Sequence, residues 1–135
     1  MRIVRGTGGT SERRSETFTG EVWADPLLPA TSGVTINNVF FTPGARTHWH
    51  RHEGGQILHV TAGGGFVCAE GGRPYRLRAG DTVWTPAHEM HWHGADEHGY
   101  LLHTAVSLGS TVWDRPVTGD EYTSGDAGRE RRSDE

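Results

Sequence analysis

The chain has 135 residues, 22% of them charged and 20 of them glycine, and its formal net charge is −4. This length supports one hydrophobic core, and the acidic balance gives no reason to expect nucleic acid or an anionic membrane as a partner. No apolar run reaches the ~20 residues that span a bilayer, residues 1–16 lack the apolar stretch of a signal peptide, and the single Cys68 cannot form an internal disulfide. We therefore expect a soluble protein of the reducing cytoplasm.

The two ends of the chain are polar and rich in residues that favour turns. We expect residues 1–17 to form a flexible N-terminal segment and residues 119–135 to form a polar, disordered C-terminal tail. Neither end can bury enough apolar surface to offset the entropy that is lost on ordering. Residues 18–118 between them are expected to form a single domain.

Within this domain, short runs of β-branched and aromatic residues alternate with Gly and Pro turns, which is typical of β-strands. In chain order we expect strands in residues 33–43, 47–52, 56–63, 65–72, 74–81, 82–86, 90–95 and 99–108. Gly71 and Gly72 indicate a hairpin turn, and no stretch has a convincing apolar stripe of helical period. Many short strands with frequent turns favour an all-β jelly-roll barrel, although a plain β-sandwich fits the same pattern.

Several of the nine histidines recur at every second position. Side chains alternate across a strand, so His48, His50 and His52 would share one face, and His91 and His93 would share another. Neutral imidazole is the commonest metal ligand in proteins, so these groups could hold one ion. They could instead be surface histidines or hydrogen-bonded core histidines. Two His-x-His pairs on either side of a glycine-rich hairpin are much stronger evidence for a metal than one pair alone.

The residues around these histidines resemble the two motifs of the cupin family, which implies a cupin double-stranded β-helix. The first motif requires a Gly, a His-x-His pair, an acidic ligand and a Gly at fixed intervals, and these positions are Gly44, His50, His52, Gln56 and Gly63. The second motif has the same kind of spacing, with Gly80, Pro86 and His91. The chain departs from the family at two positions, since His88 replaces a glycine of a turn and Gln56 replaces a glutamate.

A subgroup of small bacterial cupins, which includes the cupin-type (R)-hydroxynitrile lyases, resembles the chain more widely, over about residues 18–122. In this subgroup a divalent metal, typically manganese or iron, is held by two His, a Gln and a later His. The resemblance therefore implies a metal site made of His50, His52, Gln56 and His91. Zinc, nickel or cobalt would also suit these ligands. Cupins of this size usually dimerise through their sheets, which implies a homodimer or a higher homo-oligomer.

The resemblance also implies a substrate pocket beside the metal. A pocket histidine of the subgroup corresponds to His103, our candidate for the general acid–base because an imidazole pKa can lie near neutrality. A hydrogen-bonded core histidine is the alternative interpretation of His103. The other expected pocket residues are His48 at the rim, His93, Asn37, and Ser107, which stands where the lyases have a glutamine.

Three imidazoles and an amide are neutral, so a bound ion would keep its full divalent charge and favour a developing alkoxide, enolate or cyanide. We therefore expect a metal-dependent enzyme that acts on a small molecule. It would combine a Lewis-acid metal with a histidine acid–base in reversible cleavage or addition at a C–C bond. A dioxygenase or polyketide cyclase on the same metal site is one alternative, and a non-catalytic cupin that binds a small ligand is another.

Overall fold

The computed structural model describes residues 1–6 and 9–128, with side chains described as far as residue 124. Within these residues the chain forms twelve β-strands and one α-helix. In chain order they are β1 (Glu12–Arg14), β2 (Phe18–Thr19), β3 (Val22–Thr31), β4 (Val34–Phe41), β5 (Arg46–Thr47), β6 (His50–His52), β7 (Gly55–Ala69), β8 (Tyr75–Arg78), β9 (Thr82–Thr85), β10 (His91–Ala95), β11 (Leu101–Leu108), β12 (Thr111–Trp113) and α1 (Gly119–Gly128). No helix in this part of the chain is long and apolar enough to cross a membrane.

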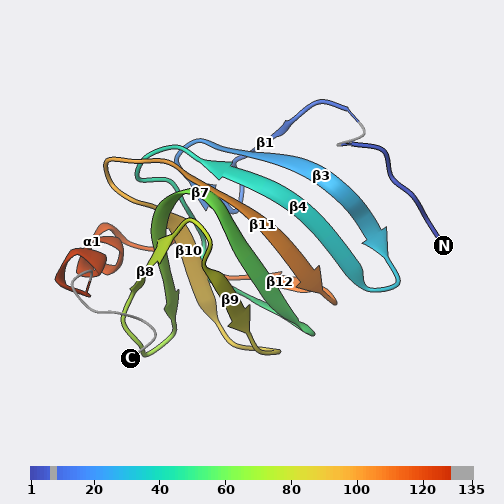
Figure 1. Cartoon of the computed structure of the whole chain (residues 1–135). Helices are drawn as coiled ribbons and strands as arrows, with labels where there is room; N and C mark the ends of the chain where they lie inside the picture. Colours follow the sequence, from blue (N-terminus) through green and yellow to red (C-terminus); the bar gives the residue numbers. More distant parts are fainter. Residues whose placement is uncertain (7–8, 129–135) are drawn as a thin grey trace.

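The strands form two curved antiparallel layers that share β7 (Figure 1). In one layer the order is β1-β3-β4-β11-β7, and β9 pairs with the first part of β7. In the other layer the last part of β7 pairs with β8 and β10, and β10 pairs in turn with β5 and β6. β2 pairs with β5, and β12 pairs with β6. This arrangement confirms the predicted all-β barrel and its single domain.

β7 is one strand of 15 residues where the sequence predicted two separate strands around a glycine turn. The glycines bend the strand without ending it. Gly63 has a φ of +74°, and a Cβ there would collide with the carbonyl of Tyr100. A Cβ on Gly65 would collide with the carbonyl of Gly94. The glycine run therefore permits close approach of neighbouring backbones, which lets β7 cross from one layer to the other.

β3 was absent from the predicted strands because Pro26 and Pro29 interrupt its sequence. β1 pairs only with residues Val22–Ala24 of β3, so the rest of β3 forms an edge within the described part of the sheet. Proline is tolerated at such an edge because its missing N–H is not needed by a neighbouring strand. The pairing of β1 also gives residues 12–14 of the predicted flexible N-terminal segment a defined strand.

Two hydrophobic clusters hold the barrel together. The first lies between the layers and contains Val22, Val39, Phe41, Ala45, Val60, Leu77, Ala95 and Leu101. The second lies next to α1 and contains Trp49, Phe66, Cys68, Trp92, Val117 and Tyr122. Burial raises the pKa of the Cys68 thiol to about 11, with Glu121 acting in the same direction, so this cysteine packs as an unreactive thiol.

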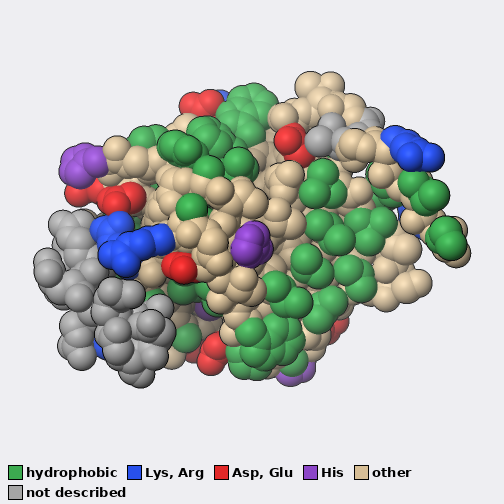
Figure 2. All heavy atoms as spheres, in the orientation of Figure 1, with side chains coloured by type: hydrophobic (Ala, Val, Ile, Leu, Met, Phe, Trp, Pro, Cys, Tyr) green, Lys and Arg blue, Asp and Glu red, His purple; other side chains and the backbone are tan. Residues whose placement is uncertain are grey.

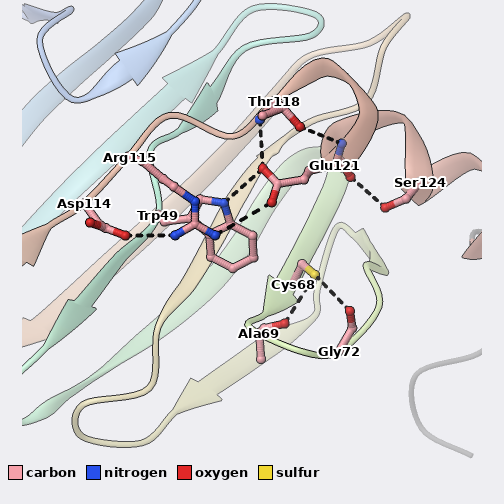
Figure 3. A network of polar contacts seen from close by, with 9 residues as sticks. All are labelled: Trp49, Cys68, Ala69, Gly72, Asp114, Arg115, Thr118, Glu121 and Ser124. Atoms are coloured by element: carbon pink, nitrogen blue, oxygen red, sulfur yellow. Dashed lines mark hydrogen bonds and ion pairs between the residues drawn. The ribbon is translucent and has the colours of Figure 1, made fainter.

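Residues 119–124 are helical and Tyr122 among them is buried, so the prediction of a disordered tail is wrong for them. The N–H of Thr118 donates to Glu121 Oε1 at 2.9 Å, and the N–H of Glu121 donates to Thr118 Oγ1 at 3.1 Å (Figure 3). This reciprocal pair is a capping box, which stabilises a helix start. Tyr122 is 7% exposed, and its hydroxyl donates to the carbonyl of Ala95 at 2.6 Å. Residues 129–135 of the predicted tail lie outside the described residues.

Candidate metal centre and cavity

Four side chains of the predicted ligand set come from three strands that meet inside the barrel. His50 and His52 lie on β6, Gln56 lies on β7 and His91 lies on β10, directly opposite His50 in the antiparallel pair. Their exposed fractions are between 1% and 4%. The ring centroids of His50 and His91 are 4.2 Å apart, and those of His50 and His52 are 5.0 Å apart. The strands therefore bring these four side chains to one buried point.

The three imidazoles of this set are each held through Nδ1. The Nδ1 of His50 lies 2.9 Å from the carbonyl of His48, and the Nδ1 of His91 lies 2.9 Å from the carbonyl of Glu89. A carbonyl only accepts hydrogen bonds, so both Nδ1 atoms carry the proton and both Nε2 atoms carry a lone pair. The Nδ1 of His52 lies 3.0 Å from the Thr111 hydroxyl, and its buried Nε2 has no hydrogen-bond partner among the described residues.

Gln56 is oriented so that its amide oxygen faces the imidazoles. Its Nε2 donates to the Ser107 hydroxyl at 3.0 Å, which turns Oε1 toward His91 Nε2 at 3.2 Å. Because the Nδ1 of His91 carries the ring proton, two lone pairs face each other across this short distance. A cation at this point could accept both lone pairs. The donor set therefore fits a divalent metal bound by imidazole nitrogens and an amide oxygen.

Burial keeps these imidazoles neutral. It lowers the pKa of His50 well below its ordinary value of 6.5, and the neighbouring His91 lowers it further. Burial and His91 lower the pKa of His52 to about 4. The pKa of His91 is also lowered by burial. Neutral imidazoles can bind a metal near pH 7 without first losing a proton.

His93 lies nearer to the metal centre than the sequence predicted. Alternation along β10 puts it on the same face as His91, and the ring nitrogens of His50, His91 and His93 lie within 4.8 Å of one another. The Nδ1 of His93 contacts the Nε2 of His103 at 3.1 Å, while its buried Nε2 has no partner among the described residues. His93 is therefore a further candidate ligand as well as a neighbour of His103.

A cavity of about 240 Å³ opens beside these groups. His93, His103, Ser107 and Asn37 line it, as do the aromatic rings of Phe18 and Trp113 and a set of small hydroxyl residues, Thr17, Thr35, Thr47 and Thr111. His103 is fully buried on β11, where every second residue is buried, and burial lowers its pKa to about 4. It is therefore neutral near pH 7, and its pKa lies below the near-neutral value that the sequence suggested for an acid–base.

Comparison with known proteins agrees with this architecture. A cupin domain matches residues 38–104. The (R)-mandelonitrile lyase of Granulicella tundricola is 40% identical over 129 residues, which cover 90% of this chain and 98% of the relative. This chain is a cupin.

Two solved structures from Thermotoga maritima extend the comparison. A cupin-like protein is 41% identical with a TM-score of 0.79, over 83% of this chain and 92% of that one. A predicted oxalate decarboxylase is 26% identical with a TM-score of 0.70, over 81% of this chain and 100% of that one.

His48 was expected at the pocket rim, and this cupin does not place it there. β5 ends at Thr47 and β6 begins at His50, so the chain bends at His48 and Trp49 and the alternation of faces is interrupted. Thr47 and His50 both line the cavity, whereas the side chain of His48 does not. What His48 contributes is its carbonyl, which holds the ring of His50.

His88 occupies the turn that precedes His91 and has a φ of +69°, a conformation that favours glycine. Its N–H donates to the carbonyl of His52 at 2.9 Å, so the turn ties the strand of one ligand to the strand of another. The departure from the cupin pattern at this position therefore leaves the turn intact.

Sequence reasoning missed several residues of the cavity wall, namely Arg14, Thr17, Phe18, Thr111 and Trp113. They come from β1, β2, β12 and the loop before β2, which lie outside the two motifs. Their short strands are fixed by pairing with distant residues, as in the pairs of Phe18 with Thr47 and of Trp113 with His50. No local pattern of the sequence signals such pairing.

Proposed function

We propose that this cupin is a metal-dependent enzyme that cleaves or forms a C–C bond next to a hydroxyl or carbonyl group of a small molecule. His50, His52, Gln56 and His91 would hold the metal, with manganese or iron as the first candidates and zinc, nickel or cobalt as others. The observation that carries the proposal is the contact of 3.2 Å between the lone pairs of His91 Nε2 and Gln56 Oε1, with Ser107 holding the amide in that orientation.

The metal would act as a Lewis acid that keeps its full divalent charge, because all four ligands are neutral. The protein supplies the remaining parts of the site. The Nδ1 hydrogen bonds of His50, His52 and His91 fix the ring orientations before any ion arrives. Ligands that are held in this way lose little freedom on binding, which increases metal affinity.

His103 would serve as the general base and acid. In the cleavage direction it would accept the proton of the substrate hydroxyl, and the electron pair of the O–H bond would form the carbonyl as the C–C bond breaks. The leaving carbanion, cyanide in the case of a cyanohydrin, would then take up a proton, so the products are a carbonyl compound and the protonated leaving group. The contact between His103 Nε2 and His93 Nδ1, at 3.1 Å, would hold the base in place during both transfers.

The relatives support a lyase more than the alternatives. The relative that is 40% identical over almost its whole length is named an (R)-mandelonitrile lyase. Ser107 hydrogen bonds to a ligand, and Asn37 adds a neutral polar group to the cavity wall. These neutral groups suit a substrate with a hydroxyl or carbonyl group.

Metal analysis and a turnover assay together test the proposal. Purified protein should contain about one divalent ion per chain and should cleave mandelonitrile when it is loaded with manganese, iron or zinc. A His103→Ala variant should retain the metal while turnover falls by about 10²–10⁴-fold, as expected for loss of a general acid–base. Oxygen consumption by the iron-loaded protein without cleavage would favour a dioxygenase instead, and absence of mandelonitrile cleavage with every metal would refute the hydroxynitrile lyase reaction.

We also propose that the cupin forms a homodimer through the outer face of the layer that contains β4, β11 and β9. Phe40 and Tyr100 stack on this face with centroids 5.7 Å apart, and Trp84 is 58% exposed. Hydrophobic side chains gather over these strands in Figure 2. Light scattering should give twice the chain mass, and a Trp84→Glu variant should give the mass of one chain.

A further inference from the structure

The cavity has one arginine in its wall among the described residues, and the proposed reaction does not use it. Arg14 is the last residue of β1, opposite Val22 of β3, and its side chain is 38% exposed. Its neighbour Arg13 projects to the other side of the strand, where its guanidinium lies 5.9 Å from the centroid of the Trp23 ring. Alternation along β1 therefore sends one arginine toward the cavity and the other away from it.

The surroundings of Arg14 leave its positive charge available. No aspartate or glutamate lines the cavity among the residues that the structure describes. The partner of Arg14 is Glu12, with Nη2 and Oε1 3.1 Å apart, and the side chain of Glu12 is 55% exposed. Ion pairs of this exposed kind contribute little to stability because water and salt compete with them. A second carboxylate that enters the cavity could therefore take the place of Glu12.

The shape and polarity of the cavity limit what could enter. Its volume of about 240 Å³ is below the ~300–1,000 Å³ of pockets for drug-sized ligands, so its ligand is small. The wall next to β1 contains the hydroxyl of Thr17 and the ring of Phe18, both of which are neutral. A guanidinium offers two parallel N–H donors, which match the two oxygens of a carboxylate.

We propose that Arg14 binds a carboxylate of the substrate, and that the substrate is therefore a small hydroxy or oxo acid anion. The inference rests on the proposed function, because it assumes that the hydroxyl or carbonyl end of the same molecule lies at the metal centre. Arg14 would thus select charged substrates over neutral ones of equal size. The contacts at the metal centre would be the same for both kinds of substrate.

Calorimetric titration with a matched pair of probes tests the inference. Mandelate carries a carboxylate, and mandelamide has nearly the same shape without the charge. An Arg14→Gln variant should bind mandelate about tenfold more weakly than the unmodified protein does, and mandelamide with an affinity within about twofold of the unmodified protein, since one charge-assisted contact is lost. Arg13→Gln is the control, because it removes the same charge from the other face of β1 and should change neither affinity.

Two further variants make the outcome decisive. Glu12→Gln removes the competing carboxylate and should strengthen mandelate binding by about two- to threefold. The effect is small because an exposed ion pair contributes little free energy. Arg14→Lys keeps the charge without the paired donors and should give an affinity between those of the unmodified protein and Arg14→Gln. If Arg14→Gln changes both probes equally or neither, Arg14 does not bind the carboxylate and the inference is wrong.

Metal content, measured on every sample, separates this inference from the proposed function. If Arg14→Gln contains as much metal as the unmodified protein and shows no selective loss for mandelate, only the inference fails. If the unmodified protein binds no metal, the proposed function fails. The selective loss of mandelate on Arg14→Gln can still be measured in the metal-free protein, where it would support the carboxylate contact.

Discussion

The two ends of the cavity are built by different means. At the inner end, the candidate ligands from β6, β7 and β10 are almost fully buried, and each of their imidazoles is fixed by a hydrogen bond through Nδ1. At the outer end, Arg14, Thr17 and Phe18 come from short segments near the start of the chain, and Arg14 is 38% exposed. In the proposed enzyme, reaction chemistry would depend on the buried interior, whereas selection of substrates would depend on a wall that sequence changes can alter at little cost to the fold.

The largest expected effect comes from a ligand at the inner end. Replacing His91 by Ala should lower metal affinity by more than about 100-fold, which exceeds the loss typical of residues that only support ligands. Metal content after dialysis, measured by mass spectrometry, checks this. His48→Ala is the matched control, since its side chain lies outside the cavity and its carbonyl remains. Equal metal loss in both variants would contradict the assignment of His91.

Acid should destabilise the metal-free protein through the buried inner histidines. The pKa of His103 is lowered by burial from 6.5 to about 4. Between these values the unfolded chain binds a proton that the folded protein excludes, so stability falls as the pH falls from about 6.5 to about 4. His103 alone should account for about 3 kcal/mol. Urea unfolding at several pH values checks this, and His103→Gln should flatten the dependence while the exposed His98→Gln should not.

A smaller effect is expected from the residue that orients Gln56. Ser107→Ala removes the acceptor that fixes the Gln56 amide, so the amide can rotate and present its N–H groups to His91. Metal affinity should fall about tenfold, at the lower end of the range for groups that support ligands. Competition with a chelator measures the change, and Ser110→Ala on the exposed turn before β12 serves as the control. An unchanged affinity would mean that Gln56 is held by other contacts.

The smallest expected effect lies far from both ends of the cavity. Thr118→Ala removes half of the capping box of α1 and should lower the free energy of unfolding by about 1 kcal/mol. Turnover and metal content should stay as they are, because α1 covers the cluster of Trp49, Trp92 and Tyr122 on the outside of the barrel wall. Thermal unfolding checks the loss of stability, and the mandelonitrile assay checks that turnover is unchanged.

The comparison also explains how far the sequence could predict the structure. The inner end is encoded by short spacings, since His50 and His52 are two residues apart on one strand and Gln56 follows after a tight turn. Alternation along a strand predicts that His50 and His52 share a face, whereas the full ligand set was implied by the resemblance to the cupin motifs. The same rule of alternation gave a wrong prediction for His48. The chain bends at His48 and Trp49, so Thr47 lines the cavity in place of His48. Trp49 at this bend packs with Val117 and Tyr122, which are distant in the sequence, and no local rule predicts such contacts.

The residues at the outer end of the cavity could not be predicted either, because they are also placed by contacts between distant parts of the sequence. Arg14 reaches the cavity because β1 pairs with β3. The sequence did not predict β3, because Pro26 and Pro29 interrupt its strand pattern. The helix is different, since Thr118 and Glu121 form a capping-box pattern that was present in the sequence and overlooked. Polar composition suggested a tail, although a buried Tyr122 and a well-formed cap were enough to order residues 119–124.

The position of β7 in both layers affects how the native structure fluctuates. It carries Gln56 near its start and Cys68 near its end, and it belongs to both layers of the barrel. The ladder between β7 and β11 places Gln56 opposite Ser107, and the far end of the same strand is held by β8 and β10. Backbone amide protons of β7 should therefore be among the slowest of the domain to exchange with solvent, because neighbouring strands pair with β7 on both sides.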